Sequence, residues 1–132
     1  MNFNYPKEEK LKSKNTIDLL FSKGKSVSKY PLRLVYVPEN FPEDQKIKMG
    51  VSVSKRYFKK AVDRNYFKRI LRETYRLNKH LLLDGMDQSY AFMLLYQSKD
   101  RLKYEEINTK TIQLFEKFLI QIKKESDHNS TV

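Results

Sequence analysis

The chain has 132 residues, enough for one domain, and 39% of them are hydrophobic, which is enough to fill one modest core. Its net charge of +11 indicates a polyanionic partner, either a nucleic acid or a membrane surface. It has no cysteine, which excludes disulfides and thiolate metal sites, and no apolar run approaches the ~20 residues of a membrane span. The N-terminus lacks the pattern of a secretory signal, so we expect the protein in the cytoplasm.

The N-terminal part of the chain predicts a charged arm followed by one short helix. Residues 1–12 are mostly polar, and Asn15 is a suitable N-cap for a helix over residues 16–23. The apolar residues of this helix, which share one face, are Ile17, Leu20 and Phe21. Gly24 follows at the position where a glycine commonly ends a helix.

Three segments have the pattern of strands. Residues 32–37 are rich in β-branched and aromatic side chains, and the loop that follows contains two prolines. Residues 46–54 alternate, with one apolar face and one small, polar face. The apolar face carries Met49, Val51 and Val53, and the small face carries Gly50, Ser52 and Ser54. Residues 90–96 are apolar on both faces, which predicts a central strand.

Two longer helices are predicted in the second half, over residues 61–82 and 104–124. The order of elements is α-β-β-α-β-α, which allows one more strand before the second helix. This order predicts an α+β fold, a single-domain α/β sandwich over residues 1–125 with helices packed on a central sheet. Residues 126–132 are predicted to be a polar tail.

Positive charge is concentrated in residues 55–80, where ten Lys and Arg accompany two Asp and Glu. Within the predicted long helix, cations recur every four residues and form a slowly winding stripe on one side. The stripe consists of Lys60, Arg64, Lys68, Arg72 and Arg76, with Arg69 and Lys79 at its edges. The opposite side, predicted to pack on the sheet, carries Val62, Tyr66, Phe67, Ile70, Thr74 and Leu77.

Three interpretations of this stripe differ in what lies against it. An ordinary solvated helix face mixes Glu with Lys four residues apart, whereas this stripe brings repelling cations together. A membrane-binding helix needs a large exposed apolar face, which this helix uses for the core. Phosphates neutralise such a stripe, so a nucleic acid is the predicted partner. Asn65, among the cations, either reads a base edge or sugar or is a solvated amide.

Residues that carry out catalysis are scarce in this chain. The two histidines, His80 and His128, are far apart in sequence and do not have the spacing of a metal site. The three glycines are scattered, so no phosphate-cradling loop is predicted. The adjacent pair Glu8 and Glu9 points in two directions and is predicted to be surface charge. We therefore predict no catalytic site and no metal site in the protein itself.

Two segments in close succession resemble the protein component of bacterial ribonuclease P. Residues 50–56 read Gly-Val-Ser-Val-Ser-Lys-Arg, and residues 61–73 read Ala-Val-Asp-Arg-Asn-Tyr-Phe-Lys-Arg-Ile-Leu-Arg-Glu. These are similar to the strand-end and helix signatures of that family, and the resemblance covers about residues 5–122. It departs at Tyr66, where the family has the second Arg of an R-N-R motif. It departs again before the helix, where a family glycine is absent.

The resemblance implies a fold, a function and two binding surfaces. The fold contains a left-handed β-α-β crossover. The protein binds a catalytic RNA subunit and the 5′ leader of precursor tRNA and promotes endonucleolytic removal of that leader. The chemistry, with its Mg²⁺, belongs to the RNA, and no organic cofactor is involved. The implied RNA contacts are Lys55, Arg56, Lys60, Arg64, Asn65, Lys68, Arg69, Arg72 and Arg76. The implied leader cleft, between the first helix and the sheet, is lined by Ile17, Phe21, Tyr36 and Ser52.

Two alternatives stay open beside this interpretation. The first is a non-catalytic protein that binds structured RNA, such as a ribosome-associated factor or an RNA chaperone. The second is a DNA-binding module, which is not expected because the sequence lacks the short second helix of a helix-turn-helix. For Phe21 and Tyr36, the alternative to a leader contact is ordinary packing in the core.

Overall fold

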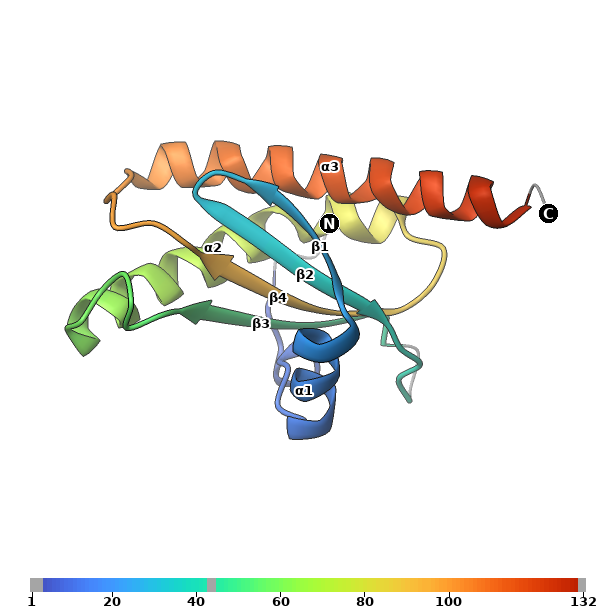
Figure 1. Ribbon diagram of the computed structural model, residues 1–132, viewed down its shortest axis with the longest axis horizontal. Coiled ribbons are helices and arrows are strands. Elements are labelled where there is room, and N and C mark those ends of the chain that lie inside the picture. Colours follow the sequence, from blue (N-terminus) through green and yellow to red (C-terminus); the bar gives the residue numbers. More distant parts are fainter. Residues whose placement is uncertain (1–3, 43–44, 131–132) are drawn as a thin grey trace.

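The computed structural model describes residues 4–42 and 45–130, and it contains one four-stranded sheet with helices on both faces (Figure 1). The elements in chain order are η1 (Lys7–Glu9), α1 (Lys14–Lys23), β1 (Lys25–Lys29), β2 (Leu32–Pro38), β3 (Ile47–Val53), α2 (Ala61–Gly85), β4 (Tyr90–Tyr96) and α3 (Tyr104–Ser130). This arrangement confirms the predicted α+β sandwich. Among the described residues, no helix combines the length and apolar character needed to cross a membrane.

The strands lie in the order β1-β2-β4-β3. Strand β2 pairs antiparallel with both β1 and β4, whereas β3 pairs parallel with β4. Strand β4 therefore lies inside the sheet, as its two apolar faces predict. Strand β1 is the additional strand that the predicted element order allowed without giving its position. Its Lys-Ser-Val-Ser-Lys pattern buries Val27 alone, so it lacks the apolar face by which a strand is predicted.

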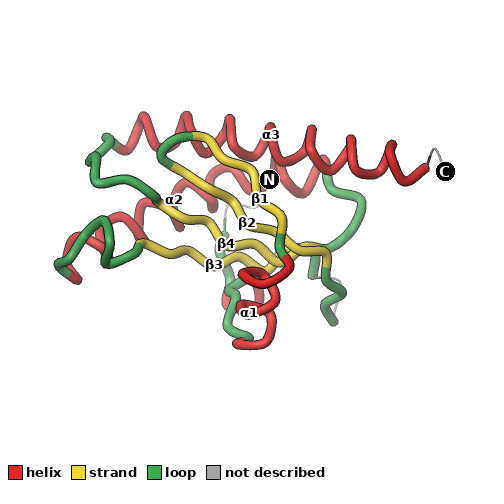
Figure 2. The backbone as a smooth tube through the Cα atoms, viewed as in Figure 1, coloured by secondary structure: helices red, strands yellow, loops and turns green. Residues whose placement is uncertain are grey.

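The connection from β3 through α2 to β4 is the crossover that the resemblance implies. Figure 1 shows both strands running toward the same end of the molecule, with β4 above β3 and α2 behind the sheet. This geometry is left-handed, whereas such connections are right-handed in about 98% of cases. Figure 2 shows that the loops before α2 and α3 lie at the same end of the sheet as the β1–β2 hairpin.

The sheet separates two hydrophobic cores of unequal size. The larger core lies between the sheet and the pair α2 and α3, and its aromatic residues include Tyr36, Phe67, Tyr75, Phe92, Phe115 and Phe118. The smaller core lies on the opposite face, beneath α1, and contains Leu20, Val35, Ala91 and Met93. Only the larger core is covered by two helices, so much of the α1 side of the sheet remains near the surface.

Several element ends differ from their predicted positions. Helix α1 begins earlier, with Ser13 as its N-cap: the Ser13 hydroxyl, not Asn15, accepts a hydrogen bond from the Thr16 amide, at 3.3 Å. Helix α3 continues through Ser130, into the stretch predicted to be a polar tail; residues 131–132 lie outside the described part, as do residues 1–3 of the arm.

Candidate nucleic-acid interface

Helix α2 buries a different set of residues from the one that the helical wheel predicts. Its buried residues are Phe67, Ile70, Leu71, Thr74, Tyr75, Asn78, Lys79 and Leu82. Val62 and Tyr66, predicted to face the sheet, are 71% and 41% exposed. The prediction is wrong for these two because α2 begins beyond the tips of the strands, where no sheet lies beneath it (Figure 1). Tyr66 instead lies beside Arg69, whose guanidinium is 5.9 Å from the ring centroid.

The cations of α2 fall into two groups. Lys60, Arg69 and Arg72 are exposed, whereas Arg64, Lys68 and Arg76 are half-buried; the uncharged Asn65 is exposed as well. Arg64 turns back toward the loop before the helix and donates to the carbonyls of Phe58 and Lys59, at 3.0 and 2.7 Å. The centre of the exposed face is therefore Asn65, Arg69 and Arg72.

Arg76, at the far end of the predicted stripe, forms an ion pair on its own helix. Its Nε donates to Oε2 of Glu73 at 3.2 Å. This hydrogen bond holds the pKa of the Glu73 carboxyl below its ordinary value. Arg76 therefore has a carboxylate beside it, and its share in binding a phosphate is reduced.

Lys79 is not an edge of the cationic stripe, because it is buried against the N-terminal arm. Its ammonium donates to the two carboxylate oxygens of Glu9 at 2.8 and 3.1 Å, and the Tyr75 hydroxyl donates to the same carboxylate at 2.6 Å. Beside them, Tyr5 packs edge-on against Tyr75 and donates to the carbonyl of Met49. Burial raises the pKa of Tyr5 to about 12. The sequence pattern could not show this pair because Glu9 and Lys79 are 70 positions apart.

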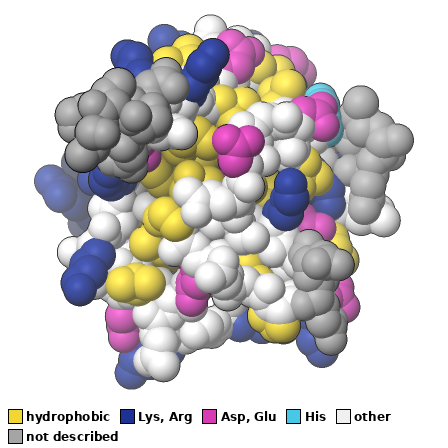
Figure 3. Space-filling view, turned by 90° about the vertical axis from the view of Figure 1, so that its right-hand side faces the viewer, with side chains coloured by type: hydrophobic (Ala, Val, Ile, Leu, Met, Phe, Trp, Pro, Cys, Tyr) yellow, Lys and Arg dark blue, Asp and Glu magenta, His cyan; other side chains and the backbone are white. Residues whose placement is uncertain are grey.

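Exposed cations gather at the end of the sheet where α2 begins, and we call this group the basic end. It consists of Lys29, Lys55, Arg56, Lys59, Lys60, Lys99 and Arg101. All seven are exposed. Lys29 is the last residue of β1, and the other six lie in the segments before α2 and α3, which Figure 2 places at the same end of the sheet as the β1–β2 hairpin. The opposite end of the molecule, seen in Figure 3, has scattered cations mixed with acidic and apolar side chains.

Arg101 belongs to the basic end but was missed by the sequence reasoning. It pairs with Asp63 at 3.2 Å, and its guanidinium lies 5.7 Å from the ring of Phe58 and 5.3 Å from that of Phe67. The rings of Phe58 and Phe67 stack with their centroids 4.7 Å apart. This ring stack and the guanidinium of Arg101 together hold the loop before α2. No local sequence pattern identifies Arg101 as part of this site. It lies near the start of α2 because β3, which leads to α2, and β4, which leads to Arg101, are neighbouring strands.

Three of the four predicted cleft residues lie on the α1 side of the sheet, one of them on β3 and two on α1. The register places Ser52 opposite Leu95, with Arg33 on the other side of Leu95. Ile17 packs against this face, and Phe21, one turn later, is 59% exposed. Ser52 is half-buried, so Ile17, Phe21 and Ser52 lie on one side of the sheet, as predicted.

Tyr36 is the predicted cleft residue that the structure places elsewhere. It is 2% exposed, in the larger core, with its ring 4.8 Å from that of Phe118 and its hydroxyl donating to Glu125 at 3.0 Å. The prediction that it lines the cleft is wrong because alternate residues of a strand face opposite sides. Val35, one position earlier, faces α1 instead.

Among the described residues, no group of three His, Asp or Glu side chains is arranged to hold a metal ion.

The model of the family described as Ribonuclease P matches residues 5–119 of the chain. The chain belongs to the ribonuclease P protein family. A ribonuclease P protein component of Porphyromonas gingivalis is 41% identical over 102 residues, which is 76% of this chain and 74% of that protein. The ribonuclease P protein component of Dictyoglomus thermophilum is 30% identical over 87% of this chain and 92% of that protein.

Solved ribonuclease P proteins have the same fold. The protein from Thermotoga maritima superposes with a TM-score of 0.66 at 22% identity, over 83% of this chain and 96% of that chain. The protein from Staphylococcus aureus gives a TM-score of 0.65 at 20% identity, over 82% and 93% of the two chains. At such identities the likeness supports the fold alone.

In this member of the ribonuclease P family, the two candidate surfaces adjoin. Strand β3 carries Ser52 on the α1 face and ends at Val53, and the chain then enters the basic end at Lys55. The step from one surface to the other is three residues long. The path along β3 from the α1 face to the cations before α2 therefore crosses no helix.

Proposed function

We propose that this chain acts as the protein subunit of a ribonuclease P holoenzyme that removes the 5′ leader from precursor tRNA. In this proposal, the basic end and the exposed face of α2 bind the catalytic RNA, and the α1 face binds the leader. The observation that carries it is the junction of the two surfaces along β3, in a chain of this family. Such a junction suits a substrate whose single-stranded part leads into a structured RNA.

The binding chemistry differs between the two surfaces. Exposed Lys60, Arg69 and Arg72 suit contacts with phosphates, and Asn65 between them suits a base edge or a sugar. On the α1 face, the exposed ring of Phe21 offers a platform for stacking a base. The small side chain of Ser52 lets a sugar-phosphate chain approach the sheet closely.

We assign the phosphodiester chemistry to the RNA subunit and its Mg²⁺ ions, following the family resemblance. The protein then contributes by binding and orienting the precursor beside the RNA, which lowers the barrier by fixing the reacting geometry. The predicted cytoplasmic location agrees with a role in tRNA maturation.

The test is reconstitution with the cognate catalytic RNA and precursor tRNA. We expect the protein to lower the Mg²⁺ concentration needed for leader cleavage, and to make the holoenzyme bind precursor more tightly than mature tRNA. Equal affinity for the two tRNAs, with no change in Mg²⁺ demand, would instead indicate a protein that binds structured RNA without acting on the leader.

A further inference from the structure

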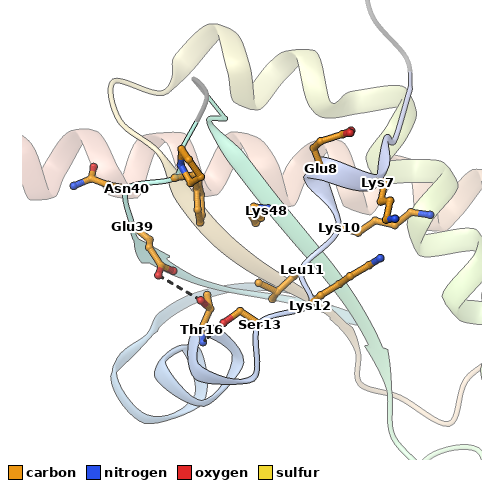
Figure 4. A pocket seen from close by; sticks show the side chains of 12 residues that line it. Lys7, Glu8, Lys10, Leu11, Lys12, Ser13, Thr16, Glu39, Asn40 and Lys48 are labelled. Atoms are coloured by element: carbon orange, nitrogen blue, oxygen red, sulfur yellow. Dashed lines mark hydrogen bonds between the residues drawn. The ribbon is translucent and has the colours of Figure 1, made fainter.

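Beside the N-terminal end of α1 lies a hollow of about 590 Å³, which we call the arm pocket. Its walls come from the N-terminal arm, the first turn of α1, the segment after β2 and the start of β3 (Figure 4). Four of its lining residues are lysines, Lys7, Lys10, Lys12 and Lys48, and two are glutamates. None of these lysines belongs to the stripe on α2, and only Lys48 lies on the α1 face of the sheet.

The arm is fixed in place, so the pocket is preformed. Lys10 pairs with Met49 at the outer edge of β3, and the amide of Leu11 donates to the Met49 carbonyl at 3.1 Å. The buried pair of Glu9 and Lys79 holds the arm from the other side, at 2.8 Å. A pocket whose walls are already ordered binds a ligand without first losing that conformational freedom.

The two sides of the pocket differ in chemistry. Figure 4 shows Lys7, Lys10 and Lys12 on one side, with Glu8 beside them, and Glu39 with Asn40 on the other. The ring of Phe41, also in the lining, lies 5.8 Å from the ammonium of Lys48. One side therefore suits a phosphate, and the other offers an aromatic ring and polar groups, which suit a base. A nucleotide presents these two parts together.

Glu39 adds a second indication of a base. Its Oε1 accepts a hydrogen bond from the Thr16 hydroxyl at 3.3 Å, whereas its Oε2 is buried and has no hydrogen-bond partner among the described residues. A buried carboxylate oxygen without a donor costs free energy. The exocyclic amino group of adenine or cytosine is a suitable donor.

We propose that the arm pocket binds a nucleotide of single-stranded RNA, in the part of the leader distant from the cleavage site. This inference rests on the proposed function, because it assumes that a leader lies on the α1 face. Lys48 and Ser52 alternate on that same face of β3, so a strand lying on Ser52 leads toward Lys48. The distal nucleotide places its phosphate by Lys12 and Lys48 and its base on Phe41.

The experiment measures the affinity of the reconstituted holoenzyme for precursor tRNAs whose leaders lengthen one nucleotide at a time. In the wild type we expect a gain in affinity at the length that reaches the pocket, larger when the added nucleotide is A or C than when it is U. Lys48→Ala and Phe41→Leu should each reduce that gain about fivefold or more, as expected for a lost stack or phosphate contact. Phe41→Leu keeps an apolar side chain, and thermal unfolding checks that both variants are folded.

Lys124→Ala is the matched control, because it removes one exposed cation from α3, on the other side of the sheet. We expect it to leave the gain unchanged. The proposal is overturned if the wild type shows no gain at any length, if the two pocket variants keep the full gain, or if they weaken short leaders equally. Failure of the proposed function is distinct, since the protein would then not stimulate cleavage at any leader length.

Discussion

Arg64 lies in the first turn of α2, and its guanidinium is directed at the carbonyls of Phe58 and Lys59. It therefore orders the loop that carries part of the basic end. Arg69, more than one turn later, is exposed, and its guanidinium lies near the ring of Tyr66. Both arginines belong to the α2 motif, but Arg64 contacts backbone carbonyls of the preceding loop, whereas Arg69 lies exposed beside the ring of Tyr66.

Substituting each arginine should separate these roles. We expect Arg64→Ala to lower the free energy of unfolding by about 1–3 kcal/mol, because two charge-assisted hydrogen bonds are lost, and to weaken RNA binding as well. Arg69→Ala should change stability by less than about 0.5 kcal/mol and reduce the slope of log affinity against log salt by about one. Thermal unfolding and binding at several salt concentrations measure both effects. Equal destabilisation by the two variants would contradict the loop role of Arg64.

Lys79 and Glu9 form a pair whose side chains are 2% and 13% exposed. Removing one partner leaves the other charge buried, so we expect Lys79→Met to lower the free energy of unfolding by about 3–5 kcal/mol. Arg72→Met, at an exposed position of the same helix, should cost far less. Chemical denaturation of the two variants provides the comparison, and a cost below about 1 kcal/mol for Lys79→Met would show that the pair does not hold the arm.

At this scale, the sequence does not determine which side of an element faces its neighbours. A helical wheel fixes the angles between residues of one helix but not which side meets a neighbour. It therefore assigns Val62 and Tyr66 to the core and Lys79 to the surface, and the structure reverses all three. Tyr36 is predicted on the wrong face because an alternating strand has two faces, and the sequence does not say which one α1 covers.

At Gly24, the C-cap of α1, a close approach and not a left-handed backbone requires glycine. Its φ is −68°, which any residue adopts, but an added Cβ would lie 2.2 Å from the carbonyl oxygen of Leu20 and 2.9 Å from Val35. We expect Gly24→Ala to lower the free energy of unfolding by about 1–3 kcal/mol, the usual cost of overpacking. Ser22→Ala, at an exposed position of the same helix, is the control, and a neutral Gly24→Ala would mean that α1 shifts freely on the sheet.

Phe21 tests whether the outer face of α1 is used for binding. Because the side chain is 59% exposed, Phe21→Ala should change stability by less than about 1 kcal/mol. The loss of one base stack should weaken precursor binding by the holoenzyme about 5- to 100-fold, while assembly with the catalytic RNA is unchanged. The two affinities are measured separately. A variant that loses stability but not precursor affinity would assign Phe21 to packing.

The elements are predicted most accurately where one pattern dominates. Strand β4 has the bounds that the sequence predicts, Tyr90–Tyr96, because its residues are apolar on both faces. Strand β1 has no such pattern, because it alternates Lys and Ser around a single Val27 and gains its place by pairing with β2. The end of α3 is predicted too early because its last turns are polar, and polarity alone does not end a helix.

The whole molecule has two adjoining surfaces of different chemistry. We therefore expect the affinity for RNA at each surface to depend differently on the salt concentration. Assembly with the catalytic RNA through about six phosphate contacts should weaken roughly 10³-fold or more between 50 and 200 mM salt. Binding of the leader, which includes base stacking, should weaken less. Titrations of the RNA subunit and of precursor tRNA at several salt concentrations measure both slopes, and equal slopes would argue against the division into two surfaces.

The sandwich and its element order followed from sequence patterns, whereas the left-handed crossover followed only from the family resemblance. No periodicity carries the hand of a connection. The basic end likewise became visible only with the fold, since Lys29, Lys55 and Arg101 come from three separate parts of the chain. Long-range contacts of this kind depend on strand order, which a local pattern does not contain.

The fixing of the arm has a consequence for how the chain acquires its surfaces during synthesis. The arm is synthesised before its partners Met49 and Lys79, and Lys79 follows Glu9 by 70 positions. A nascent chain thus has an incomplete arm pocket until α2 has formed. The RNA recognition that we propose for the arm pocket therefore requires most of the domain to be complete.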